Sequence, residues 1–82
     1  MQAEPLTPRL ERYIQTRNLT QKFTKQLSLF LTNPRHPSLH TELLEPKELK
    51  FYSFRIDKKY RAVFSFKDSE TLIILEINNH YA

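Results

Sequence analysis

The second half of the sequence contains side chains that together could cleave RNA without a metal ion: Arg55, Arg61, His80 and Tyr81. A guanidinium group suits phosphate because it is planar, permanently charged and rich in N–H donors. A histidine gives or takes a proton near neutral pH, and a tyrosine stacks on a base or donates a hydrogen bond. Glu42 or Glu76 could act as the base or hold the histidine. In such a reaction a base takes the 2′-hydroxyl proton, the oxygen attacks the adjacent phosphorus, arginine stabilises the charge, and an acid protonates the leaving 5′-oxygen.

The same side chains also permit structural interpretations. Arg61 could pair with Asp57 or Glu76, and the open face of a sheet is normally polar. His36 and His40 lie in or beside a proline-rich loop, and we interpret them as surface residues. Three scattered histidines without cysteine or a metal-type spacing predict no metal site.

These side chains follow three short runs rich in aromatic and β-branched residues, at residues 51–56, 60–66 and 71–77. Such runs favour strands because their side chains pack well on a pleated surface. The polar breaks between them are short, so each pair of runs is expected to form an antiparallel hairpin. Residues 40–44 are expected to form either a short strand or an extended connection, and residues 1–6 are left open as an edge strand or a frayed end.

Alternation assigns the strand residues to two faces. The face expected to meet the helices carries mostly aromatic and aliphatic side chains, among them Tyr52, Phe54, Phe64, Ile73 and Leu75. The opposite face collects Arg55, Arg61, Glu76 and His80. The sequence therefore predicts an open sheet face with two guanidinium groups, one carboxylate and one imidazole.

Two helices are expected before the sheet. Thr7-Pro8 is a favourable helix start, and Asn18 is expected to end this first helix because Asn tolerates the left-handed conformation. Thr20 is expected to cap a second helix, and Asn33-Pro34 to stop it. Its apolar face comprises Phe23, Leu27, Phe30 and Leu31. We predict one α+β domain over residues 1–82, an N-terminal antiparallel helical hairpin packed on a three- to four-stranded antiparallel sheet.

Composition narrows the function classes. The net charge is +4, and the whole excess lies before Glu42, which suggests a polyanion or an acidic protein as partner. The absence of glycine argues against phosphate-cradling loops and nucleotide-cofactor folds. The absence of cysteine slightly favours a reducing compartment, so we expect a cytoplasmic protein. No signal peptide or membrane span is expected, because the N-terminus lacks a long apolar run.

Several segments in the right order resemble the RelE/ParE superfamily of toxin–antitoxin toxins. They are HPSL at residues 36–39, FYSFRI at 51–56, YRAVF at 60–64 and the pair His80-Tyr81. The resemblance covers most of the chain and implies two helices packed on a small antiparallel sheet. It also implies metal-independent cleavage of mRNA on the ribosome, and neutralisation by an antitoxin protein that wraps the toxin.

Carried over from the YoeB-like branch of that superfamily, the active set comprises Arg61, His80, Tyr81 and Glu42. Arg55 matches a basic position of that branch, and we assign Lys50, Lys58 and Lys59 with it to RNA phosphate binding. Tyr52 and Phe54 stand where RelE itself uses lysines, and Lys50 stands where a glycine is common.

The resemblance therefore predicts a ribosome-dependent mRNA endonuclease toxin, with no cofactor and no small-molecule ligand. Its expected partners are a cognate antitoxin, the ribosome and mRNA. Two alternatives remain open: a non-enzymatic member, either a ParE-like DNA gyrase inhibitor or an inactive antitoxin-binding protein, and a generic small basic RNA-binding domain. The same fold serves both RNA cleavage and gyrase inhibition, so fold alone does not separate them.

Overall fold

Helix α1 (Pro8–Thr16) begins and ends as its residue types predict. The Thr7 hydroxyl accepts a hydrogen bond from the Leu10 N–H, and proline occupies the first turn. Asn18 has φ 57°, the left-handed conformation in which asparagine commonly follows a helix. The computed structural model describes residues 1–79, so His80 and Tyr81 lie outside the described residues.

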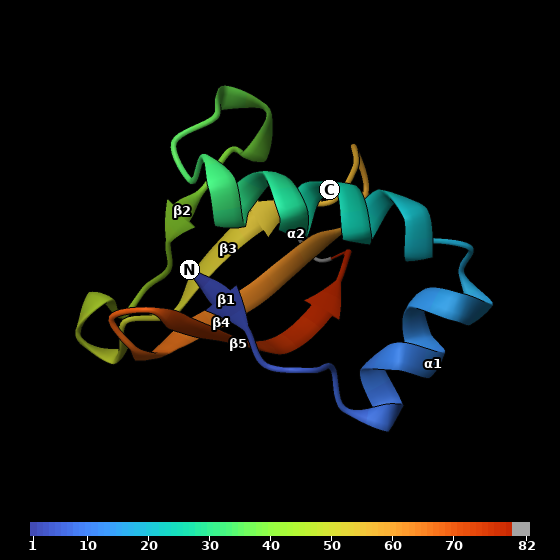
Figure 1. Ribbon diagram of the computed structural model, residues 1–82, viewed down its shortest axis with the longest axis horizontal. Coiled ribbons are helices and arrows are strands. Elements are labelled where there is room, and N and C mark those ends of the chain that lie inside the picture. Colours follow the sequence, from blue (N-terminus) through green and yellow to red (C-terminus); the bar gives the residue numbers. More distant parts are fainter. Residues whose placement is uncertain (80–82) are drawn as a thin grey trace.

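Helix α2 (Thr20–Thr32) lies across the sheet, and α1 lies near the end of β5 (Figure 1). The prediction that Thr20 caps α2 is wrong, because Thr20 is the first helical residue and the preceding Leu19 makes no side-chain cap hydrogen bond. Leu19 is instead buried, so its position serves the core. Asn33 follows the last turn, as the Asn-Pro pair predicted.

The sheet has five strands in the order β1-β5-β4-β3-β2, one more than the largest number predicted. Their bounds are β1 (Gln2–Ala3), β2 (Glu42–Leu43), β3 (Tyr52–Arg55), β4 (Arg61–Asp68) and β5 (Thr71–Asn78). Strands β2 to β5 pair antiparallel, as expected. Strand β1 pairs parallel with β5, so the sheet is mixed rather than purely antiparallel. Two single turns of 3₁₀ helix, η1 (Pro37–Leu39) and η2 (Lys47–Leu49), interrupt the connection from α2 to β3.

The core lies between α2 and one face of the sheet. Phe23 and Phe30 of α2 stack on Phe54 of β3, and Phe30 also meets Phe64 of β4 edge-on with ring centroids 4.9 Å apart. Burying these rings removes a large apolar area from water, which stabilises a domain of this size. Tyr52 stacks on Phe64, which is fully buried, with the ring centroids 5.6 Å apart. Within residues 1–79, both helices lie on this face of the sheet, and the opposite face has no helix over it (Figure 1).

A β-bulge in β5 overturns part of the predicted face assignment. Ile73 and Leu75 were expected in the core, whereas Leu72 and Ile74 are buried there and Leu75 is 36% exposed. Val63 pairs with Glu76 and the next residue of β4 pairs with Ile74, so Leu75 is the extra residue of the bulge. A bulge places two residues opposite one and resets the alternation of the strand. Glu76 therefore remains on the open face as predicted.

Candidate functional site: an arginine row on the open sheet face

Arg61 is held against the open face of the sheet by the chain around it. Its Nε donates to the Ser53 Oγ at 3.0 Å, and one terminal nitrogen donates to the carbonyl oxygens of Ser53 and His40. Only 8% of the side chain is exposed. Within the described chain no buried side-chain nitrogen or oxygen lacks a partner, so the buried nitrogens of this cation are hydrogen-bonded. Arg61 thereby ties β4 to β3 and to the segment that leads into β2.

Glu42 lies beside this arginine. It pairs in register with Ser53, and its carboxylate stands 4.0 Å from the Arg61 guanidinium. The carboxylate is largely in water, since 57% of the side chain is exposed. The ion pair is long and its acidic partner is solvated, so the Glu42 carboxylate is accessible to a ligand. The structure thus brings together two of the predicted site residues, although their roles stay predictions.

Arg55 completes a row across the sheet. It pairs in register with Arg61, which in turn pairs with Asn78 of β5. The side chain is half-buried and makes no hydrogen bond or ion pair with another residue of the described chain. Like charges directly opposite each other on neighbouring strands are destabilising. An anion bound at this row would replace that repulsion by charge-assisted hydrogen bonds.

The predicted phosphate-binding lysines lie at the two ends of β3. Lys58 and Lys59 are exposed in the turn between β3 and β4, close in sequence to Arg55. Lys50 is exposed at the other end, where it follows η2 with φ 56°. A glycine would adopt this conformation without strain, which explains why the position accepts one in the family that the sequence resembles.

The turn beside the arginine row is fixed by Asp57. Its Oδ1 accepts hydrogen bonds from the N–H groups of Lys59 and Tyr60, and its Oδ2 pairs with Lys22 of α2 at 3.3 Å. Burial alone would raise the pKa of Asp57, but these backbone hydrogen bonds and the Lys22 ammonium group lower it overall. Asp57 and Glu76 were the two acidic residues suggested as structural partners of Arg61. Asp57 instead pairs with Lys22, and Glu76 pairs with Arg9 of α1 at 3.3 Å.

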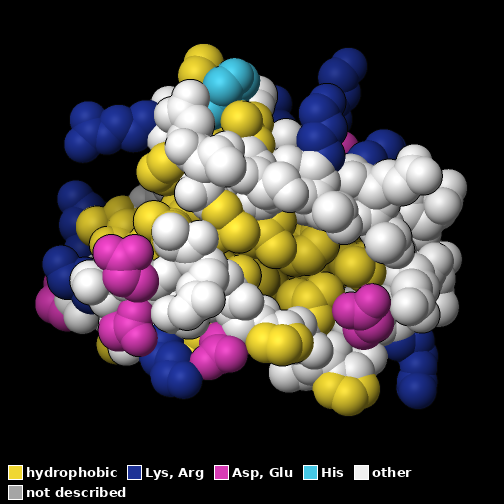
Figure 2. Space-filling view, viewed as in Figure 1, with side chains coloured by type: hydrophobic (Ala, Val, Ile, Leu, Met, Phe, Trp, Pro, Cys, Tyr) yellow, Lys and Arg dark blue, Asp and Glu magenta, His cyan; other side chains and the backbone are white. Residues whose placement is uncertain are grey.

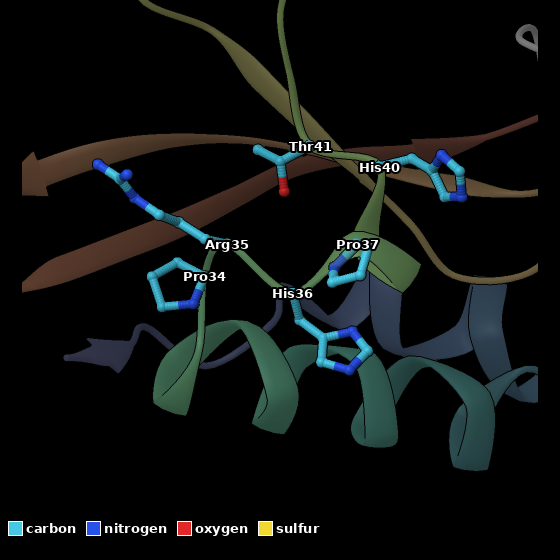
Figure 3. A pocket seen from close by; sticks show the side chains of 6 residues that line it. All are labelled: Pro34, Arg35, His36, Pro37, His40 and Thr41. Carbon is cyan, nitrogen blue, oxygen red and sulfur yellow. The ribbon is translucent and has the colours of Figure 1, made fainter.

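The two described histidines lie around a hollow of about 320 Å³ in the loop between α2 and β2 (Figure 3). The Thr41 hydroxyl points into the hollow, whereas the rings of His36 and His40 extend away from it (Figure 3). The His36 Nδ1 accepts the Ser38 N–H at 3.1 Å, so this ring caps η1. The Arg35 guanidinium and the two imidazoles extend in different directions and do not converge on one point (Figure 3). The hollow therefore lacks the converging cationic groups that would bind an anion.

Three residues that hold the row were missed by the reasoning from residue types. Ser53 binds Arg61, the His40 carbonyl closes over it, and Gln26 of α2 donates to the Arg55 carbonyl at 2.8 Å. Gln26 lies on the buried face of α2, three residues after Phe23. A polar residue within this apolar stripe was the sequence signal that could have indicated a buried hydrogen bond. Ser53 alternates in phase with Arg55, which was a second signal.

Two further findings concern the described chain as a whole. No helix within residues 1–79 is both long and apolar enough to cross a membrane. Over the same residues, no three histidine or acidic side chains stand close enough together to hold a metal ion.

Comparisons by sequence give one short match. No family model matches the sequence. A protein of Haemophilus influenzae described as uncharacterized is 44% identical over 45 residues, which are 55% of this chain and 39% of that protein. The match therefore spans well under half the length of that relative.

Solved structures match over nearly the whole chain. A YoeB/ParE toxin from Agrobacterium tumefaciens has a TM-score of 0.74 at 18% identity, covering 99% of this chain and 100% of the toxin. YafQ from Escherichia coli has a TM-score of 0.74 at 10% identity, covering 96% and 90%. The YoeB-YefM toxin–antitoxin complex of Staphylococcus aureus contains a chain with a TM-score of 0.70 at 22% identity, covering 98% and 94%. The chain has the fold of these toxins, as the sequence resemblance predicted.

Proposed function

We propose that this protein is the toxin of a type II toxin–antitoxin system and cleaves mRNA on the ribosome. The observation that carries the proposal is the row formed by Arg55 and Arg61 on the uncovered face of the sheet, with the Glu42 carboxylate 4.0 Å from Arg61. Two adjacent guanidinium groups suit a phosphate diester, and the nearby carboxylate suits proton transfer. The shared fold with YoeB and YafQ toxins supports the same function.

In this proposal the reaction needs no metal, because the site residues supply both charge stabilisation and proton transfer. Arg55 and Arg61 hold the phosphate and stabilise the negative charge that develops on its oxygens. The 2′-hydroxyl loses its proton to a base, its oxygen bonds to phosphorus, and the bond to the 5′-oxygen breaks. His80 serves as general acid or base, with Glu42 assisting proton transfer and Tyr81 orienting a base or the phosphate.

The proposal is tested by adding the purified protein to a reconstituted translation reaction and mapping mRNA ends. The wild type is expected to cut the message, and Arg55→Ala to cut about 10²- to 10³-fold more slowly, the usual cost of removing one preorganised charged donor. Arg12→Ala is the matched control, since Arg12 lies exposed on α1 and its loss changes the net charge equally. An intact message with the wild type refutes the proposal, and so does Arg55→Ala cutting as fast as Arg12→Ala.

The antitoxin would have an apolar surface available on the helix-bearing side. Hydrophobic side chains form a band across that side, with acidic and basic side chains around its edge (Figure 2). Leu27 and Leu31 of α2 are partly exposed beside the core, as are Ala3 and Leu6 before α1. A band of this kind on a small domain suits a protein partner. The Staphylococcus aureus YoeB toxin was solved in complex with YefM, which supports the expectation of an antitoxin here.

A second candidate is a non-enzymatic member that binds its antitoxin or DNA gyrase. The observation favouring it is the burial of Arg61, whose guanidinium hydrogen-bonds to Ser53 and His40 and so serves the fold. This candidate predicts growth arrest, if any, with intact mRNA and altered DNA supercoiling. Measuring both quantities in the same cells after induction separates the two candidates.

A further inference from the structure

The open sheet face has an apolar end and a cationic end. The register places its side chains in three cross-strand rows. Arg55, Arg61 and Asn78 form the first row, and Ser53, Val63 and Glu76 form the second. Ser65 and Ile73 belong to the third. One step further along the register, Phe51 comes level with Ser65, so the third row is apolar except for one hydroxyl.

Phe51 is the exposed aromatic residue of this face. Its carbonyl accepts the Leu44 N–H, so the chain is already extended there and Phe51 alternates in phase with Ser53 and Arg55. Phe51 is 38% exposed. The core aromatics on the other face are linked ring to ring, whereas Phe51 makes none of these ring contacts within the described chain.

The neighbours of Phe51 indicate the kind of ligand. Lys50 precedes it, and Arg55 lies four residues along the same strand, about 13 Å away at about 3.3 Å per residue. An exposed ring and a cationic row on one face of a sheet match single-stranded nucleic acid, whose bases stack on aromatics while its phosphates meet cations. An apolar peptide would match the ring but not the arginine row.

We propose that Phe51 is a stacking platform for a base of single-stranded RNA whose backbone phosphate lies at the Arg55 and Arg61 row. This inference rests on the proposed function and extends it, because it assigns a substrate-binding surface to the apolar end of the sheet. Phe51 contacts the base, and the arginines contact the backbone. The aromatic ring, rather than hydrophobic bulk, sets the affinity.

Replacement of Phe51 by tryptophan provides a direct probe, because the sequence contains no other tryptophan. The emission of Phe51→Trp is expected to be quenched on addition of a short single-stranded RNA or of mRNA-programmed ribosomes. Phe66→Trp is the matched control: Phe66 is 39% exposed but lies on the opposite face, in ring contact with Tyr52. Its emission is expected to stay unchanged. Unchanged emission of Phe51→Trp, or equal quenching of both variants, overturns the inference.

Binding of labelled RNA to the full chain separates stacking from simple apolar contact. Phe51→Leu and Phe51→Ala are both expected to bind about 5- to 150-fold more weakly, the effect of losing one base–aromatic stack. Phe66→Leu is expected to bind like the wild type, and thermal unfolding checks that each variant is folded. If Phe51→Leu binds the labelled RNA as tightly as the wild type does, the inference is overturned, because the aromatic ring then contributes nothing to RNA binding. If mRNA is cut while Phe51→Trp is not quenched, the inference fails alone; if quenching occurs without cutting, the proposed nuclease activity fails alone.

Discussion

Replacing Arg61 by alanine is expected to destabilise the fold severely, because the guanidinium group joins three segments of the chain. The substitution removes the hydrogen bonds to the Ser53 Oγ, the Ser53 carbonyl and the His40 carbonyl. Leaving a buried acceptor without its donor typically costs about 1–3 kcal/mol, and the 8% exposure of this side chain leaves little room for water to replace the lost hydrogen bonds. For a domain of this size, each kcal/mol lowers the melting temperature by about 4–8 °C. We therefore expect Arg61→Ala to melt at least about 12 °C below the wild type.

The assay is urea and thermal unfolding followed by circular dichroism, with two further variants. Ser53→Ala removes one acceptor and is expected to cost about 1–3 kcal/mol, because the Arg61 Nε–H is left without that partner. The double variant is expected to lose less than the sum of the single losses, since the two residues share a contact. Arg12→Ala is the control and is expected to stay within about 0.5 kcal/mol of the wild type. An Arg61→Ala protein as stable as Arg12→Ala would refute the assignment of Arg61 as a structural tie.

Three further predictions follow from single contacts. Lys50→Gly is expected to stabilise the fold by about 1 kcal/mol, because φ is 56° there, whereas Lys50→Ala should give no gain; urea unfolding compares the two. Asp57 has a pKa below its ordinary value of 3.8, so its stabilising effect is present above about pH 4 and is lost as the pH falls through the folded-state pKa. Asp57→Asn should therefore be less stable than the wild type at pH 7 and converge with it in acid, as pH-dependent urea unfolding would show. Gln26→Met is expected to cost about 1–3 kcal/mol by leaving the Arg55 carbonyl unbonded, whereas the exposed Gln21→Met should be neutral in the same measurement.

Local signals in the sequence predicted most of the elements. The Thr7-Pro8 start and the Asn33-Pro34 stop act within one turn of chain, so they could be recognised without knowledge of the partners. The aromatic runs of β3 and β4 kept a strict alternation, and their core faces were correctly assigned. Strand β1 was left open because two residues carry too little pattern, and its parallel pairing with β5 depends on a contact between the two ends of the chain.

The errors arose where tertiary contacts override local pattern. Every residue from Leu72 to Leu75 is aliphatic, so alternation gave no indication of which set faces the helices, and the bulge at Leu75 then changed the phase. The position of Arg55 and Arg61 on the sheet could be predicted from the same local pattern, whereas their roles stay predictions. Arg55 and Arg61 alternate in phase across a short hairpin, which brought them to one row. The tie from Arg61 to the His40 carbonyl could not be foreseen, because it joins residues 21 positions apart and one of them lies in the irregular segment before β2.

The central claim is that the arginine row handles the phosphate of RNA during attack by the neighbouring 2′-hydroxyl. The most direct measurement uses two ribosome-bound messages that differ in one atom. One is all-ribose, and the other carries a single 2′-deoxynucleotide on the 5′ side of the mapped cut. The account predicts that the purified protein cuts the first message and leaves the second intact at that position, because the nucleophile is missing. Equal cutting of both messages, or no cutting of the all-ribose message, would contradict it.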